Sequence, residues 1–347
     1  MATDHKAWLE QFKTFEASLN GQSSRPIHKV RKSAISHFEK TSLPTSADEA
    51  WKTINTSIMT QADYTLAKPY TLGDISVETL APYTLPETIQ LVFVNGHWAK
   101  DLSQISKLPK GIRVEALSEA LVKDPQNVSD QLSHIVGSEQ RVFATLNTAF
   151  IQDGAYIHIT KNTVCEHPIH LIFFSHAENV PTVAHTRNLI VAEDNAQLQI
   201  IETYAGMGEQ TYLTNSVTEF VAGENTQIDH YKVEVETLQG IHIANQHATL
   251  DRSANVTSHA FSIGGAFVRN DVSAHLGGEG CEATVNGLYL LEGSQLVDNY
   301  TLLEHAEPHC PSHELYKGIL GDNARAVFRG KILVHQKAQK TDAYQQN

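Results

Sequence analysis

The stretch Leu189–Ile200, which reads LIVAEDNAQLQI, contains two apolar runs joined by the polar turn Glu193-Asp194-Asn195. A run of this kind followed by alternating apolar and polar residues predicts a strand, a turn and a second strand. The pattern returns at 217–228 as VTEFVAGENTQI and, more loosely, three more times before the end of the chain. Its turn centres are 30, 29, 27 and 42 residues apart, at Asn195, Asn225, Ala254, Cys281 and Asn323.

Repeated strand–turn–strand units predict either a stacked solenoid or a β-sandwich, and the period alone does not choose between them. From Ala155 onward the period stays at two residues, and no helical period of useful length interrupts it. An alternating α/β fold is therefore excluded for this region. We expect the β core to occupy residues 151–347.

The first 63 residues instead carry a helical period and predict an N-terminal helical domain. An apolar face of Trp8, Phe12, Phe15 and Leu19 predicts one helix, which Asn20-Gly21 would end. The run Ser46-Ala47-Asp48-Glu49 fits a capping box and predicts a second helix containing Trp51 and Ile54.

Residues 64–150 mix the two periods and predict an α/β connecting region. The run Ile89–Val94 predicts a strand that enters a tight turn at Asn95-Gly96. Helical spacing returns at Val114, Leu117 and Leu121 and again after Asp124-Pro125. A further short helix is expected from Val142 to Phe150.

Composition limits the classes of function. The chain has 347 residues and a formal net charge of −13, which disfavours a nucleic-acid partner or an anionic membrane surface. Its three cysteines are too few for a disulfide framework and indicate a reducing compartment. The N-terminus resembles no signal sequence and no apolar run approaches about 20 residues, so we expect a cytoplasmic protein without a membrane anchor.

Short catalytic motifs give no support for an enzyme. Gly278-Glu279-Gly280-Cys281-Glu282-Ala283 matches G-x-G-x-x-A, but the residues after it alternate like a strand, whereas a dinucleotide site needs a helix there. Gly330-Lys331 lacks the other residues of a phosphate-binding loop, and the chain has no G-x-S-x-G elbow. We therefore assign no catalytic and no cofactor-binding residue.

One segment resembles a metal site. His305, His309, Cys310 and His313 lie within nine residues and are ligand types that zinc and iron accept. Strand alternation would direct the three histidines to one face and Cys310 to the other, which favours packing and hydrogen bonding over metal binding. We assign no metal ligand and keep these four residues as candidates, and Cys281 is either a thiol ligand or a small buried residue.

A long, ordered set of motifs resembles the SufB/SufD family of iron–sulfur cluster assembly proteins, most closely its SufD branch. The C-terminal set consists of Arg269-Asn270-Asp271-Val272, Gly278-Glu279-Gly280, Gly287-Leu288-Tyr289, Val297-Asp298-Asn299, Thr301 with His305, Ser312 to Leu320, Val327 to Ile332 and Ala338 to Asn347. The SufD-like set consists of Arg31, Ala34, Phe38, Leu43-Pro44-Thr45, Glu49, Trp51-Lys52, Leu146 to Phe150 and Asp153-Gly154.

The resemblance implies a right-handed parallel β-helix preceded by a helical domain. It also implies a noncatalytic scaffold that pairs with a SufB-like protein and binds a SufC-like ATPase. In that arrangement the iron–sulfur cluster is assembled by the complex, and this chain binds no cofactor stably. The exposed end of the β-helix is expected to be an interaction surface.

Two alternative functions remain open, and the C-terminus gives one further expectation. The fold also occurs in carbohydrate-active enzymes, and a histidine- and cysteine-based metal-binding protein is the third alternative. The family continues beyond the Gln-Gln-Asn run with a Cys-Ser-His-Gly segment and helices, whereas this sequence stops at Asn347. The expectation is therefore a chain truncated at its C-terminus that assembles poorly with a SufC-like partner.

Overall fold

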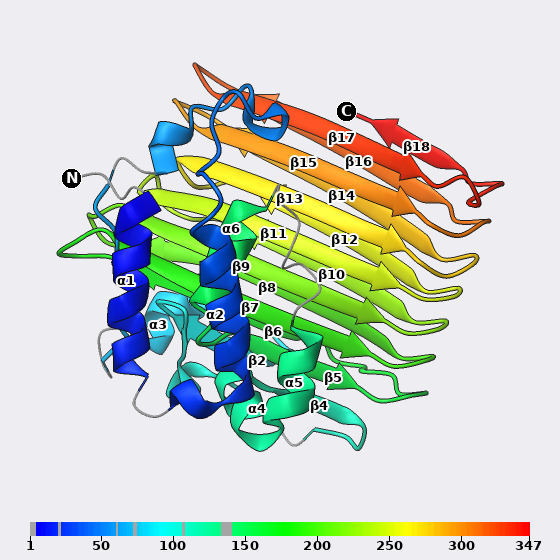
Figure 1. Ribbon diagram of the computed structural model, residues 1–347, viewed down its shortest axis with the longest axis horizontal. Helices are drawn as coiled ribbons and strands as arrows, with labels where there is room; N and C mark the ends of the chain where they lie inside the picture. The colour runs from blue at the N-terminus through cyan, green and yellow to red at the C-terminus, as the bar shows by residue number, and fades with distance from the viewer. Residues whose placement is uncertain (1–4, 20–21, 60–61, 72–74, 106–107, 133–140) are drawn as a thin grey trace.

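The chain forms a parallel β-solenoid preceded by helices (Figure 1). The computed structural model describes all residues except 1–4, 20–21, 60–61, 72–74, 106–107 and 133–140. Sheet A has nine strands in the order β17-β15-β13-β11-β9-β7-β5-β4, with β1 beside β7, and the nine strands of sheet B follow the order β18-β16-β14-β12-β10-β8-β6-β2-β3. Consecutive long strands alternate between the sheets, so the sandwich alternative is wrong and the predicted β-helix class is confirmed. The strands are β1 (Thr65–Leu66), β2 (Ile89–Val94), β3 (His97–Trp98), β4 (Ile112–Ala116), β5 (Ala155–Ile159), β6 (Ile169–His176), β7 (Thr182–Ala192), β8 (Gln197–Met207), β9 (Tyr212–Ala222), β10 (Gln227–Glu234), β11 (Gly240–Leu250), β12 (Asn255–Ser262), β13 (Phe267–Leu276), β14 (Glu282–Leu291), β15 (Leu296–His305), β16 (Ser312–Leu320), β17 (Arg325–Val334) and β18 (Ala343–Gln346).

Each turn of the solenoid joins a strand of sheet A to the next strand of sheet B through one corner. We number the turns from β5–β6 as the first to β17–β18 as the seventh. A residue with positive φ, the region that glycine and asparagine enter most readily, occupies this corner in every turn. These residues are Asn162 (59°), Asn195 (60°), Asn225 (57°), Ser253 (57°), Gly280 (70°), His309 (61°) and Lys340 (58°).

Asparagine side chains connect the first three corners. The Asn195 amide donates to Oδ1 of Asn162 at 2.8 Å, and the Asn225 amide donates to Oδ1 of Asn195 at 2.8 Å. The ladder uses a residue type that both tolerates the corner backbone and bonds its equivalent in the next turn. It explains why asparagine marks the most regular units of the repeat.

The first four predicted turn centres lie at this common corner, but Asn323 does not. Asn323 follows Asp322, whose φ is 54°, at the opposite corner between β16 and β17. The sixth turn instead has its common corner at His309. The 42-residue interval from Cys281 to Asn323 is therefore longer than the others because it connects two different corners of the solenoid.

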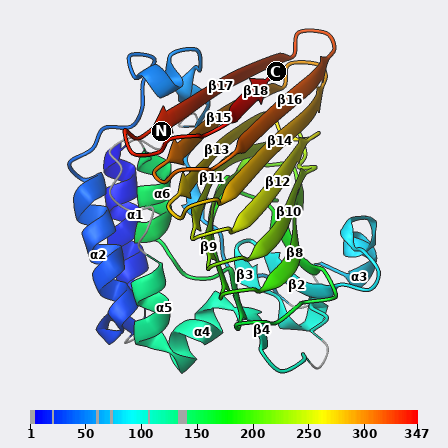
Figure 2. The same ribbon diagram turned by 90° about the vertical axis from the view of Figure 1, so that its right-hand side faces the viewer.

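Helices of the predicted helical region and the predicted helix at the end of the connecting region, α6 (Val142–Ala149), cover the outer face of sheet A (Figures 1 and 2). Helix α1 buries Trp8, Phe12 and Phe15, and every residue of α6 is buried. The Asn147 amide of α6 donates to the backbone oxygens of Thr186 and Asn215, at 2.8 Å each, and so fixes the helix on the sheet. The helices are α1 (His5–Ser18), α2 (Pro26–Phe38), α3 (Val77–Leu80), α4 (Leu117–Lys123), α5 (Pro125–Gln131) and α6 (Val142–Ala149), with 3₁₀ turns η1 (Gln22–Ser24), η2 (Glu49–Trp51), η3 (Thr56–Met59), η4 (Ala81–Tyr83) and η5 (Lys100–Leu102).

The connecting region contributes strands to both sheets. The predicted strand at Ile89–Val94 is β2, which pairs in parallel with β6 and turns at Asn95-Gly96 into β3. Strand β4 pairs antiparallel with β5. Among the described helices, none is long and apolar enough to cross a membrane.

Two helix predictions were wrong in extent. The capping box at Ser46–Glu49 leads only into η2, because the Thr45 amide donates to Oδ2 of Asp48 at 2.7 Å and the Ala50 carbonyl is bonded by an arginine of the solenoid. Val114 lies in β4, and the helix begins at Leu117. The predicted helix stop at Asn20-Gly21 lies outside the described residues.

Close packing between corners explains a glycine of the rejected dinucleotide motif. A Cβ atom on Gly278 would lie 2.0 Å from the backbone nitrogen of Arg252, whereas the nearest atom to a Cβ on Gly321 would be 3.8 Å away. We expect Gly278→Ala to lower the free energy of unfolding by about 1–3 kcal/mol, the usual cost of overpacking. Gly321→Ala is the matched control and should leave the free energy of unfolding, measured with urea, nearly unchanged. Equal stabilities of the two variants would contradict this packing account.

Candidate functional site: a charged network inside the solenoid

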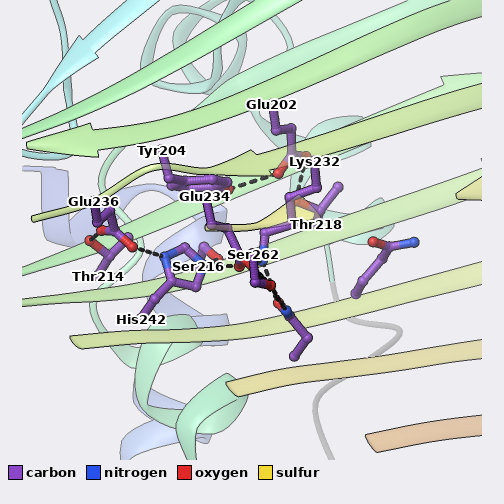
Figure 3. A network of polar contacts seen from close by, with 12 residues as sticks. Glu202, Tyr204, Thr214, Ser216, Thr218, Lys232, Glu234, Glu236, His242 and Ser262 are labelled. Carbon is purple, nitrogen blue, oxygen red and sulfur yellow. Dashed lines mark hydrogen bonds and ion pairs between the residues drawn. The ribbon is translucent and has the colours of Figure 1, made fainter. Parts of the chain in front are cut away.

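Charged side chains fill the centre of the solenoid between the two sheets (Figure 3). Glu202 and Tyr204 lie on β8, and Lys232 and Glu234 lie on β10. Strand alternation directs these residues inward, where most interior positions of other turns are apolar. All four are buried.

Lys232 and Glu234 form the central ion pair. The Lys232 ammonium donates to Oε1 of Glu234 at 2.6 Å and to Oδ1 of Asn270 at 2.6 Å, and it lies 5.3 Å from the Tyr204 ring centre. The Ser262 hydroxyl donates to Oε2 of Glu234 at 2.5 Å. Burial is the largest single influence on Glu234 and opposes its ionisation, but Lys232, His242 and the Ser262 hydroxyl together outweigh it and lower the pKa of the carboxyl below its ordinary value.

Glu202 is a second buried carboxylate with a full set of partners. The Thr218 hydroxyl donates to it at 2.8 Å, the Tyr204 hydroxyl at 2.7 Å, and His230 Nε2 lies 3.6 Å from its Oε1. Burial alone would raise the pKa of Glu202, but His230 and the two hydroxyls lower it by more, and the resulting pKa is about 2. The side chain is therefore charged throughout the physiological pH range.

His242 connects Glu234 to a third carboxylate, that of Glu236. Its Nδ1 lies 2.9 Å from Oε2 of Glu236, and its Nε2 lies 3.5 Å from Oε1 of Glu234. The Thr214 hydroxyl donates to Oε1 of Glu236 at 2.8 Å. Three carboxylates thus share one ammonium group and two imidazole rings in the interior.

The network surrounds very little empty space. The cavity beside Lys232 and Asn270 has a volume of about 10 Å³, which is room for roughly one water molecule. This chamber is too small for an organic substrate. The arrangement can hold charges and protons at fixed positions between turns.

Residues from the two sets of family motifs meet on the outer face of sheet A. The Arg269 guanidinium lies 3.7 Å from the Trp51 ring centre and donates to the Ala50 backbone oxygen at 2.9 Å. Arg269 also pairs with Asp271, at 2.7 Å, and with Asp298. Arg329 donates to the Glu49 backbone oxygen at 2.8 Å, so two arginines of the solenoid hold the segment around Trp51.

The structure does not bring the four metal-ligand candidates together. His305 points inward and its Nε2 lies 3.0 Å from the Ser312 hydroxyl, whereas His313 is exposed on the outer face. His309 is the corner residue, and its positive φ interrupts the alternation, so Cys310 points inward like His305. Among the described residues, no three histidine, cysteine, aspartate or glutamate side chains are arranged to hold a metal ion.

Cys310 lies beside Cys281 instead. The two sulfur atoms are 3.6 Å apart, and both residues are fully buried. Sequence reasoning missed the pair because it assigned the turn after Cys281 to Asn323. It also missed the interior network, whose signal was charged residues in phase with buried strand positions, as in Ile200, Glu202 and Tyr204.

Two family models together match nearly the whole chain. Residues 2–171 match the SufBD protein N-terminal region, and residues 173–347 match the SufBD core domain of the SUF iron–sulfur cluster assembly system. The chain therefore belongs to the SufBD family.

Two relatives are similar over most of their length. An iron–sulfur cluster assembly SufBD family protein of Synechocystis is 28% identical over 344 residues, which cover 96% of this chain and 75% of the relative. The iron–sulfur cluster assembly protein SufD of Escherichia coli is 27% identical over 312 residues, which cover 89% of this chain and 70% of the relative. The SufD-like resemblance of the motifs is thus supported over the length of the chain.

A double-mutant cycle tests whether the interior pair is a coupled unit. Lys232→Met leaves the Glu234 carboxylate buried without its cation, and Glu234→Gln leaves the ammonium without its carboxylate. Each single change should cost about 3–5 kcal/mol in unfolding free energy, because an unpaired buried charge is strongly destabilising. The double variant should cost clearly less than the sum of the two.

Urea unfolding measures all three variants, and Lys161→Met is the matched control. Lys161 pairs with Asp194 at 2.8 Å on the exposed surface, where its loss should change stability little. Additive effects of the two interior substitutions would contradict the coupling.

Proposed function

We propose that this chain is a noncatalytic scaffold of iron–sulfur cluster assembly that pairs with a SufB-like protein and binds a SufC-like ATPase. The observation that carries the proposal is the consecutive match of both SufBD family regions. The cluster would be the cargo of the complex, and the isolated chain would hold none stably.

An exposed apolar surface supports the idea of a protein partner. Leu288 and Leu290 of β14 and Leu315 and Ile319 of β16 are exposed on the outer face of sheet B, and Leu290 lies directly opposite Ile319. Contiguous exposed apolar side chains are typical of protein-binding surfaces. We infer that these four residues, which we name the outer apolar patch, contribute to the contact with the SufB-like protein.

The three cysteines are free thiols, which suits a reducing compartment such as the cytoplasm. The earlier expectation that the exposed end of the solenoid binds a partner remains a prediction. The two alternative functions predict different behaviour of the isolated chain. A carbohydrate-active enzyme would turn over a polysaccharide alone, and a metal-binding protein would retain stoichiometric iron or zinc that is lost in His309→Ala.

Co-expression with SufB and SufC from the same source tests the proposal. We expect the chain to co-purify with SufB and to hold SufC only weakly, and we expect the assembled complex to acquire an iron–sulfur cluster that the chain alone does not retain. Ile319→Glu should weaken binding to SufB at least tenfold, because it places a charge in the outer apolar patch. Val77→Glu, at an exposed apolar residue of α3, is the matched control and should bind normally.

A monomeric chain that does not bind SufB at tens of micromolar would overturn the proposal. Polysaccharide turnover by the purified chain would replace it with the enzyme alternative. Normal SufB binding by Ile319→Glu would reject only the outer apolar patch as the contact surface.

A further inference from the structure

The two thiols of Cys281 and Cys310 lie at equivalent places in neighbouring turns. Cys281 directly follows Gly280 at the corner of the fifth turn, and Cys310 directly follows His309 at the corner of the sixth. Backbone hydrogen bonds flank the pair, from the Gly280 amide to the Pro308 oxygen at 3.2 Å and from the Ala283 amide to the Pro311 oxygen at 3.3 Å. The two cysteines therefore face each other across one strand spacing.

This placement fits the geometry of a disulfide bond. Adjacent strands lie about 4.7–4.9 Å apart, and disulfides join residues whose Cα atoms are about 4.4–6.8 Å apart. The sulfur atoms are already 3.6 Å from each other. Side-chain rotation can bring them to bonding distance while the turns stay stacked.

The backbone of these corners contacts one of the thiols: Cys310 donates to the Gly278 oxygen at 3.3 Å and to the Pro308 oxygen at 3.4 Å. Gly280 and His309, the residues that precede the two cysteines, are both exposed, and Gly280 has no side chain. Because both thiols are fully buried, their oxidation requires local movement at these corners that admits a small oxidant. Burial and the neighbouring thiol raise the pKa of Cys281 to about 12, so little of this thiol is ionised and it reacts slowly with oxidants.

We propose that Cys281 and Cys310 are a redox-active pair that peroxide converts into a disulfide linking the fifth and sixth turns. In the first step one thiol releases its proton, its thiolate sulfur attacks a peroxide oxygen and the O–O bond breaks, so that a sulfenic acid forms and the departing hydroxide takes up the released proton to become water. The second thiol then displaces the sulfenic oxygen as water while the S–S bond forms. In total, two thiols and one hydrogen peroxide give one disulfide and two waters.

Cys165 is the internal comparison. It is buried, its sulfur donates to the His167 backbone oxygen at 3.3 Å, and it lies in the first turn, four turns away from Cys281. Alanine occupies the residue after the corner in two other turns, as Ala196 and Ala254. Replacement of Cys281 or Cys310 by alanine is therefore compatible with the fold.

To test this, the purified full chain is treated with hydrogen peroxide under native conditions. The remaining thiols are then blocked with N-ethylmaleimide, and the peptides are mapped without reduction. We expect a Cys281–Cys310 linked peptide, a fall from three free thiols to one, and recovery of all three with dithiothreitol. Cys281→Ala and Cys310→Ala should each keep both remaining thiols unlinked. The linked protein should also unfold at a higher urea concentration than the reduced protein.

Three results would overturn the proposal. They are three unreacted thiols after native treatment, a bond that forms only in urea, and a linkage that involves Cys165. The wild-type peptide map decides the question even if an alanine variant folds poorly. The result is independent of whether SufB or SufC binds the chain.

Discussion

The parallel, in-register stacking of turns is the constraint on which the rest of the structure depends. Each residue lies beside its equivalent in the neighbouring turn, so a feature of one turn must be compatible with the turns next to it. The corner residues all take the same left-handed backbone, and asparagines there bond one another. Gly278 leaves room for the neighbouring backbone, and two cysteines come face to face because their corners stack.

The charged interior follows the same constraint. Glu202 of β8 and Lys232 of β10 are register partners in sheet B, and Glu234 of β10 contacts His242 of β11 across the interior. Burying such groups costs free energy that their mutual attraction roughly offsets, so apolar residues would stabilise the core as well. A shift of one turn against its neighbour would leave charges unpaired at a cost of several kcal/mol. We infer that the network specifies how the central turns stack more than it adds to overall stability.

The sequence carried enough information to find the strands and their repeat, because alternation and turn residues are local signals. It could not decide between solenoid and sandwich, since both have the same period, and only the resemblance favoured the solenoid. The helix expected after Ser46 failed because Arg269, far away in sequence, bonds the Ala50 carbonyl. The inward direction of the Cys310 side chain was not predicted, because strand alternation does not continue through the corner at His309. The interior charges became recognisable only when both sheets were in place.

The most direct test of this account is the ionisation of Glu202 in the folded protein. Carbon-13 NMR of labelled glutamate side chains, assigned with Glu202→Gln, would follow its carboxyl through an acid titration. We predict a pKa of about 2, below the ordinary value of 4.5, because His230, Tyr204 and Thr218 stabilise the charged form. The stability that the ionised Glu202 carboxylate contributes to the folded state is fully present above about pH 4.5 and is lost as the pH falls toward 2. A carboxyl that titrates at or above 4.5 would show that the interior is not the paired, charged network described here.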